Sequence, residues 1–204
     1  MPFDLIRRQG FIHVPKNAGS ALQEALDYQR YRGHISIRKL EKKLPLHQFY
    51  VFAVLRDPFA RAVSNYQYTR HPETKWHSIS GRDGLQPHPD YALVREASFA
   101  SYCQLLTQGR LQGLGVWPQV HFLKDRHYRC FPFSRIFLFE RLNEELPQAL
   151  HHDLGISVSL PQVNVQDYAY RLEDWYDETT FGIVADHYTE DLQWYRDIRK
   201  MWCL

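Results

Sequence analysis

Apolar runs and helical periodicities alternate along the first part of the chain. Residues 10–14 form a short apolar segment, and from 20 to 31 apolar residues recur at helical spacing. Residues 49–55 are rich in β-branched and aromatic side chains, which predicts a buried central strand. Asp57-Pro58 then predicts a helix running to about residue 70, because Asp is a good N-cap and Pro suits the first helical position.

The same pattern continues with weaker signals. We expect a brief strand at 34–37, a basic amphipathic helical turn at 38–44 and a long loop at 71–89, where Pro, Gly, His and Ser are frequent. Helices are predicted at 91–107 and 179–201, a strand at 135–140, and a helix at 143–154 that ends at Gly155. Residues 158–170 are irregular. Strands separated by helices predict an α/β fold: one three-layer domain over 1–204 with a mostly parallel central sheet.

Composition narrows the classes of function. Lys and Arg number 25 and Asp and Glu 23, so the net charge is +2, which argues against a general polyanion-binding surface but allows a local basic pocket. The apolar run at 49–55 is far shorter than the roughly 20 residues that span a bilayer, and no signal-peptide core follows Arg7 and Arg8. We therefore expect a soluble cytoplasmic protein without an integral membrane segment.

The cysteines and histidines suggest no metal centre. Cys103, Cys130 and Cys203 are odd in number and widely spaced, so they favour free thiols over a disulfide framework or a thiolate site. The 11 histidines show no ligand spacing such as HExxH.

The first motif of chemical interest is His-Val-Pro-Lys-Asn-Ala-Gly-Ser at 13–20, between a predicted strand and a predicted helix. Backbone N–H groups at a helix start attract anions, Gly19 permits close backbone approach, Lys16 adds a charge and Ser20 a hydroxyl. The GxxxxGK[ST] pattern is absent, since the lysine precedes the glycine. An ordinary strand–turn–helix joint, with Ser20 as the cap and Lys16 in solvent, explains the motif equally well.

The second motif spans 55–66. Arg56 follows the predicted central strand, at the edge where α/β sheets bind ligands, and Ser64 lies about two helical turns later. Together they could hold a phosphate, the arginine through its forked N–H groups. For Arg61, an ion pair with Asp57 one turn earlier is the favoured interpretation.

These residues carry a resemblance to a known family. HVPKNAGSAL at 13–22 resembles the 5′-phosphosulfate-binding loop of sulfotransferases, and RDPFARAVSNY at 56–66 resembles their 3′-phosphate-binding strand and helix. Further pieces resemble carbohydrate (Golgi-type) sulfotransferases: Trp117-Pro118-Gln119, Phe139-Glu140-Arg141-Leu142, Asn164, and the helix bearing Tyr188, Asp191 and Tyr195.

The resemblance implies a P-loop-like sulfotransferase fold and 3′-phosphoadenosine-5′-phosphosulfate (PAPS) as donor, with no metal required. It also implies roles for individual residues. Lys16 would stabilise the leaving bridging oxygen, and Arg56 and Ser64 would bind the 3′-phosphate. The backbone amides of the loop would hold the 5′-phosphate; these belong to Asn17, Ala18, Gly19 and Ser20.

A general base for the acceptor hydroxyl is also implied, since the family uses His or Glu. Residues 31–35 (Tyr-Arg-Gly-His-Ile) resemble the segment that holds the catalytic histidine of uronyl 2-O-sulfotransferases. His34 matches the second of two family histidines, and Arg32 stands at the first. Glu24 and His71 are competing candidates, and His34 could instead begin a strand as a half-buried residue.

The expected activity is sulfuryl transfer from PAPS to a hydroxyl of a saccharide or glycan-like metabolite, in a bacterial cytoplasm. The 70–88 segment carries basic and aromatic side chains that suit a sugar ring. A P-loop nucleotide or small-molecule kinase and a non-catalytic nucleotide-binding module are the alternatives. No nucleic-acid partner is expected, and the sequence leaves the oligomeric state open.

Overall fold

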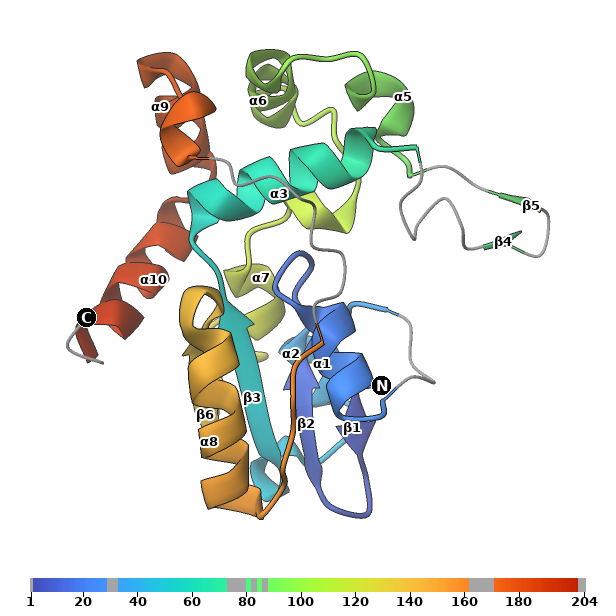
Figure 1. Cartoon of the computed structure of the whole chain (residues 1–204), viewed down its shortest axis with the longest axis vertical. Helices are drawn as coiled ribbons and strands as arrows, with labels where there is room; N and C mark the ends of the chain where they lie inside the picture. The colour runs from blue at the N-terminus through green and yellow to red at the C-terminus, as the bar shows by residue number, and fades with distance from the viewer. Residues whose placement is uncertain are drawn as a thin grey trace. The chain divides into compact units, whose positions relative to one another are not determined.

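A computed structural model describes residues 2–28, 33–72, 80–81, 84–85, 88–161 and 171–201 (Figure 1). The chain divides into two compact units. The first comprises Met1–Asp57, Pro118–Tyr168 and Gln193–Leu204, and the second Pro58–Trp117 and Ala169–Leu192. The single domain expected over 1–204 stays a prediction.

The first unit contains a four-stranded mixed sheet in the order β1-β2-β3-β6. Its strands are β1 (Phe3–Asp4), β2 (Gln9–Ile12), β3 (Tyr50–Leu55) and β6 (Arg135–Leu138). β1 pairs with β2 in antiparallel fashion, whereas the β2–β3 and β3–β6 pairs are parallel. The α/β class expected from the sequence is therefore confirmed, and two of the three strand pairs are parallel.

Helices in the first unit cover the sheet. They are α1 (Gly19–Ala25), α2 (Ile37–Leu40), α7 (Val120–Leu123) and α8 (Leu142–Leu154), with 3-10 turns η1 (Leu46–Gln48) and η3 (Phe139–Arg141). Leu22 of α1 and Leu146 of α8 share a buried cluster with Phe52 of β3. Val51 and Ala53, which alternate with Phe52, are also buried. Since alternate strand residues point to opposite faces, both faces of β3 are covered.

The second unit is mostly helical. It contains α3 (Pro58–Arg70), α5 (Tyr91–Val94), α6 (Phe99–Thr107), α9 (Glu178–His187) and the first residues of α10 (Thr189–Met201). Two 3-10 turns, η2 (Leu114–Val116) and η4 (Leu172–Asp174), and a small antiparallel pair, β4 (Ser80–Gly81) with β5 (Gly84–Leu85), complete it. Its core is aromatic, with Tyr66 of α3 packed against Phe99 and Tyr102 of α6.

Elements with strong local signals occur where the sequence predicts them. The strand expected at 49–55 is β3, and the helix expected from Pro58 to about Arg70 is α3 with those bounds. The first predicted strand is β2, shifted toward the N-terminus by one or two residues. The helix expected at 143–154 is α8, which ends at Gly155 with a φ of 68°. Glycine adopts this left-handed conformation without steric cost, which explains the stop.

Two predicted helices are interrupted. The segment at 91–107 forms α5 and α6, because Ser98 takes an extended conformation and accepts a hydrogen bond from Ser101 N at the start of α6. The segment at 179–201 forms α9 and α10, which meet at Tyr188. The Tyr188 hydroxyl donates to Val116 O at 3.0 Å, and such a tertiary bond has no local signal in the sequence.

Other predictions need correction or lie outside the described residues. No strand forms at 34–37: residues 33–36 are irregular and α2 begins at Ile37, whose three-residue spacing from buried Leu40 is helical. The strand predicted at 135–140 ends at Leu138 and continues as η3. The helix predicted at 20–31 is shorter, since α1 ends at Ala25 and residues 29–32 are outside the description. Most of 71–89 and 158–170 is also outside it.

In the stretches that the structure describes, no helix has both the length and the apolar character needed to cross a bilayer. The longest of them, α3, α8 and α10, have 13 residues each.

Asp153, near the end of α8, accepts hydrogen bonds from two residues of the sheet. It accepts from Nε of Arg135 at 2.8 Å and from Nη2 at 3.0 Å, and the Tyr50 hydroxyl donates to it at 2.6 Å. The hydrogen bonds from Arg135, then those from Tyr50 and His152, hold the pKa of Asp153 well below its usual range. Burial, followed by the Asp153 hydrogen bond, raises the pKa of Tyr50.

We predict that Asp153→Asn lowers the free energy of unfolding by about 1–3 kcal/mol at pH 6, the value of charged hydrogen bonds. A carboxyl whose native pKa lies below its unfolded value stabilises the fold above about pH 4 and loses this contribution as the pH falls. The difference between wild type and variant should therefore shrink by about 1 kcal/mol at pH 3 in urea titrations. Asp174→Asn, an exposed position, is the control; an equal loss at both pH values would contradict the assignment.

Candidate functional site

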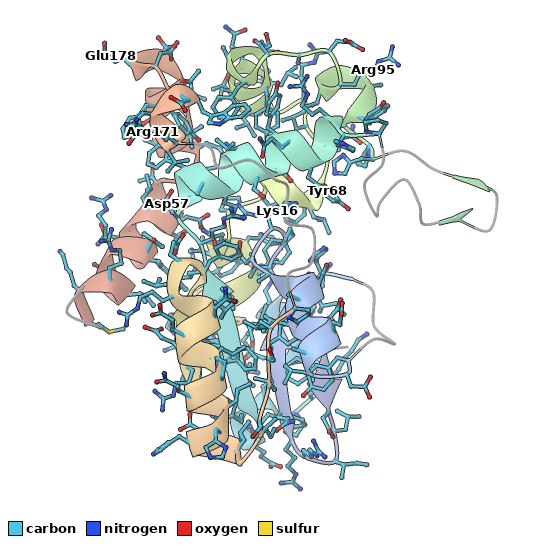
Figure 2. All side chains as sticks on the ribbon, in the orientation of Figure 1. Lys16, Asp57, Tyr68, Arg95, Arg171 and Glu178 are labelled. Atoms are coloured by element: carbon cyan, nitrogen blue, oxygen red, sulfur yellow. The ribbon has the colours of Figure 1, made fainter. Side chains whose placement is uncertain are left out.

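The loop that joins β2 to α1 lies at the carboxyl end of β2, and Figure 2 labels Lys16 on it. Lys16 and Ala18 have φ values of 70° and 59°, with Asn17 between them. Backbone that alternates in this way forms nests, in which successive N–H groups converge and bind anions. The backbone N–H groups of Ala18, Gly19 and Ser20 have no acceptor among the described residues. Because α1 has only seven residues, the capacity for an anion rests on these amides and on the Lys16 charge.

The buried side chain of Asn17 anchors the middle of the β2–α1 loop to the protein interior. Its side chain is buried, and its Nδ2 donates to Val54 O at 2.6 Å and to Gln119 Oε1 at 2.5 Å. The first bond joins the loop to β3, and the second joins it to the segment before α7. The predicted phosphate loop is therefore held by a side chain of its own that points away from solvent.

Gln119 completes this network. Its Oε1 accepts from Arg56 N at 3.0 Å, and its Nε2 donates to Arg56 O at 2.9 Å. The side-chain amide thus pairs with both backbone polar groups of Arg56, as a neighbouring strand would. Gln119 is fully buried, and leaving such groups unpaired in the interior would cost about 1–3 kcal/mol each.

Arg56 directly follows β3, as the sequence predicts, and its guanidinium is held in two ways. Nη1 donates to Lys16 O at 3.0 Å, and the guanidinium carbon lies 4.1 Å from the centroid of the Phe139 ring. The arginine therefore lies against the outer end of the loop, so that Lys16 and Arg56 bring two positive charges to the same edge of the sheet.

His13 packs against the start of α1. A Cβ atom on Gly19 would overlap the His13 imidazole, so this contact requires glycine at position 19. Burial, and next the neighbouring His34, lowers the pKa of His13 to about 3. His13 is therefore neutral at physiological pH and serves as packing.

His34 lies beside His13, with ring centroids 4.2 Å apart. Its Nδ1 lies 2.8 Å from His13 O. A carbonyl oxygen only accepts hydrogen bonds, so Nδ1 carries the proton and Nε2 of the neutral ring carries the lone pair. His34 is partly exposed. One side chain, that of His13, separates it from Gly19, so the structure brings a histidine with a defined tautomer next to the loop.

The remaining predicted residues are distributed over both units. Glu24 is exposed on α1 in the first unit. Ser64, partly exposed on α3, and His71, just after α3, belong to the second unit. Lys16, Asn17, Ala18, Gly19, Ser20, His34 and Arg56 all belong to the first.

Arg61, for which the sequence favours an ion pair with Asp57, lies in the protein interior. It is fully buried in the second unit, its Nη2 donates to Trp117 O at 3.0 Å, and its guanidinium carbon lies 5.6 Å from the centroid of the Tyr188 ring. The Tyr188 hydroxyl in turn donates a hydrogen bond to Val116 O. Arg61 therefore organises the interior of the second unit.

Gln119, Phe139 and Glu140 lie in segments that resemble carbohydrate sulfotransferases, but the sequence predicts no role for them. In the structure Glu140 Oε1 accepts from Asp57 N at 3.0 Å. Burial, followed by the charge of Glu140 and its hydrogen bond with the tyrosine, raises the pKa of Tyr195. All three residues support the backbone or side chains at the end of β3. The sequence alone does not show that these three residues lie beside the end of β3.

Over the same described stretches, no group of three or more His, Cys, Asp or Glu side chains is arranged to hold a metal ion. Comparison with models of protein families found no matching family, and comparison with curated proteins found no match.

The close packing of His13 against Gly19 should make position 19 sensitive to a larger side chain. Gly19→Ala should lower the free energy of unfolding by about 1–3 kcal/mol, the typical cost of overpacking, in urea titrations. His13→Ala in the same chain makes room for the new methyl group, so the double variant should lose less than the sum of the two single losses.

Gly182→Ala is the matched control. Gly182 lies inside α9 with nothing within 4 Å of an added Cβ, so alanine should stabilise the protein by about 0.5–1 kcal/mol. Additive losses for His13→Ala and Gly19→Ala would show that the two positions are not in contact.

Proposed function

We propose that the protein is a PAPS-dependent sulfotransferase that transfers a sulfuryl group to a hydroxyl of a saccharide or glycan-like metabolite. The carrying observation is the juxtaposition of the Lys16 loop with His34, whose Nδ1 bonds to His13 O. The strand–loop–helix from β2 to α1 and the parallel neighbour β3 support a P-loop-like sulfotransferase fold as part of this proposal. The proposed compartment is the cytoplasm.

In this proposal the loop binds the 5′ end of the nucleotide. Of the amides predicted at Asn17 to Ser20, those of Ala18, Gly19 and Ser20 surround the 5′-phosphate, because the Asn17 N–H donates to Val14 O at 3.3 Å. The Lys16 ammonium lies at the bridging oxygen between phosphorus and sulfur. Arg56 and Ser64 bind the 3′-phosphate. Arg56 suits this role because its five N–H groups can serve a phosphate as well as the Lys16 carbonyl.

The transfer is an in-line displacement at sulfur. The acceptor hydroxyl gives its proton to His34 Nε2 as its oxygen forms a bond to sulfur. The bond from sulfur to the bridging oxygen breaks, and that electron pair stays on the 5′-phosphate, where Lys16 stabilises the added charge. The products are a sulfate ester and adenosine 3′,5′-bisphosphate. No metal is invoked, because the transferred group carries less charge than a γ-phosphate.

A P-loop kinase and a non-catalytic nucleotide-binding module are the competing functions. A kinase would use MgATP, with an acidic residue near a strand end to help hold the ion. A binding module would retain the nucleotide preference but show no turnover.

We predict that adenosine 3′,5′-bisphosphate binds at least tenfold more tightly than AMP, and more tightly than ATP, in calorimetry without Mg²⁺. The additional 3′-phosphate gains charge-assisted hydrogen bonds from Arg56 and Ser64. Replacing both, as Arg56→Gln with Ser64→Ala, should remove the preference for the 3′-phosphate.

Arg95→Gln is the control for loss of a positive charge, because Arg95 is exposed and distant in the chain from both motifs. Thermal melts establish that each variant is folded. Tighter binding of MgATP would support the kinase, and a preference that survives the double substitution would refute the proposed 3′-phosphate site.

For the base, we predict that His34→Asn lowers kcat by about 10²–10⁴-fold, the usual contribution of general-base catalysis, in a radiolabelled sulfuryl-transfer assay over a panel of saccharides. The asparagine amide can still donate to His13 O, so the fold and the affinity for the bisphosphate should be preserved. His34→Ala should lose the same activity and some stability.

His121→Ala is the matched control, since His121 is a partly exposed histidine of the same unit. Unchanged kcat in His34→Asn would assign the base to another residue, with Glu24→Gln and His71→Asn the next variants. Tight bisphosphate binding with no turnover on any acceptor in the wild type would favour the binding module.

A further inference from the structure

The turn between β1 and β2 exposes two adjacent aliphatic side chains. Leu5 is 56% exposed and Ile6 95% exposed. Arg7 and Arg8, which follow, are exposed as well. The other large exposed apolar residues of the described chain are single and far apart in the sequence: Leu93, Trp117, Tyr128, Phe181 and Met201.

This turn is held in one conformation by the protein. Asp4 Oδ1 accepts from Ile6 N and from Arg7 N, both at 2.9 Å. At the other side Tyr50 N donates to Arg8 O at 2.8 Å, and Arg8 Nη1 donates to Gln48 Oε1 at 3.4 Å. The aliphatic pair is thus presented to solvent by fixed backbone.

The turn carries more positive than negative charge. Arg7 and Arg8 are exposed, and the one carboxylate of the turn, that of Asp4, accepts from backbone amides and lies 3.8 Å from Nε of Arg7. The surface around the aliphatic pair therefore presents Arg8 together with Arg7, whose charge Asp4 offsets in part.

We propose that this turn docks the protein on an anionic lipid bilayer. Leu5 and Ile6 would enter the boundary between headgroups and acyl chains, and the Arg7 and Arg8 side chains would face lipid phosphates and carboxylates. The charges complement such a membrane. Two aliphatic side chains are too small a surface for a stable dimer, which buries about 1,600 Å² in total, and aliphatic side chains add nothing to the electrostatic binding of a nucleic acid.

The proposal is independent of the proposed reaction. The turn precedes β2 and the Lys16 loop follows it, so the two lie at opposite ends of that strand (Figure 1). Docking by the turn therefore leaves the Lys16 loop at the end of β2 that is remote from the bilayer, and loss of either function need not affect the other.

Vesicle flotation tests this surface. The full chain should float with vesicles of phosphatidylcholine and phosphatidylserine in a 70:30 ratio, much less with phosphatidylcholine alone, and less at 0.5 M salt. Each basic residue near the membrane contributes about fivefold to partitioning, so Arg7→Gln with Arg8→Gln should lower binding about 25-fold. Leu5→Ser with Ile6→Ser should lower it about tenfold or more.

Two control variants make the same kinds of substitution at exposed positions outside the turn. Met201→Ser removes an apolar side chain that is 72% exposed, and Arg95→Gln with Arg110→Gln removes two exposed charges; both should float like the wild type. Absence of flotation by the wild type, or losses in the controls equal to those in the turn variants, would overturn the proposal. So would sedimentation velocity showing a dimer that the Leu5/Ile6 variant dissociates, or tighter binding to a DNA duplex than to the vesicles.

Discussion

The arrangement of the candidate site depends on the side-chain amide of Gln119, which pairs with both backbone polar groups of Arg56 and accepts from Asn17. Three segments that are distant in sequence meet at this amide: the loop after β2, the residue after β3 and the chain before α7. Because Gln119 is fully buried, solvent offers no substitute partner, and the loop, the strand end and the amide hold one another in place. Arg56 adds a second connection from outside, through Lys16 O.

Much of the fold follows from local chemistry. β3 follows from an apolar run, the start of α3 from Asp57-Pro58, and the end of α8 from Gly155, since each signal is complete within a few residues. The interruptions of the predicted helices at Ser98 and Tyr188 are harder to predict from the sequence. Tyr188 is fixed by a hydrogen bond to Val116, and periodicity carries no information about a partner 72 residues away. The strand expected at 34–37 was wrong for a related reason, because His34 bonds to His13 O in a loop and joins no sheet.

The candidate site, like the fold, has some features that the sequence predicts and others that it does not. Spacing was enough to select the Lys16 loop and to locate Arg56 after the central strand. It was insufficient to show that Gln119 supports both, or that His13 fills the space that Gly19 leaves. For Arg61, the position one turn after Asp57 favours an ion pair, and spacing alone does not show that tertiary packing buries the guanidinium against Tyr188 and Trp117 O.

Within the Lys16 loop, burial alternates with partial exposure. Asn17 and Gly19 face the interior, where they shape the backbone, whereas Lys16, Ala18 and Ser20 are partly exposed. The buried positions that anchor the loop are thus different from the side chains that would touch a bound molecule. Substitutions at 16, 18 and 20 can therefore alter what is recognised while the scaffold beneath is retained, which gives such a loop room to diverge in evolution without first losing its shape.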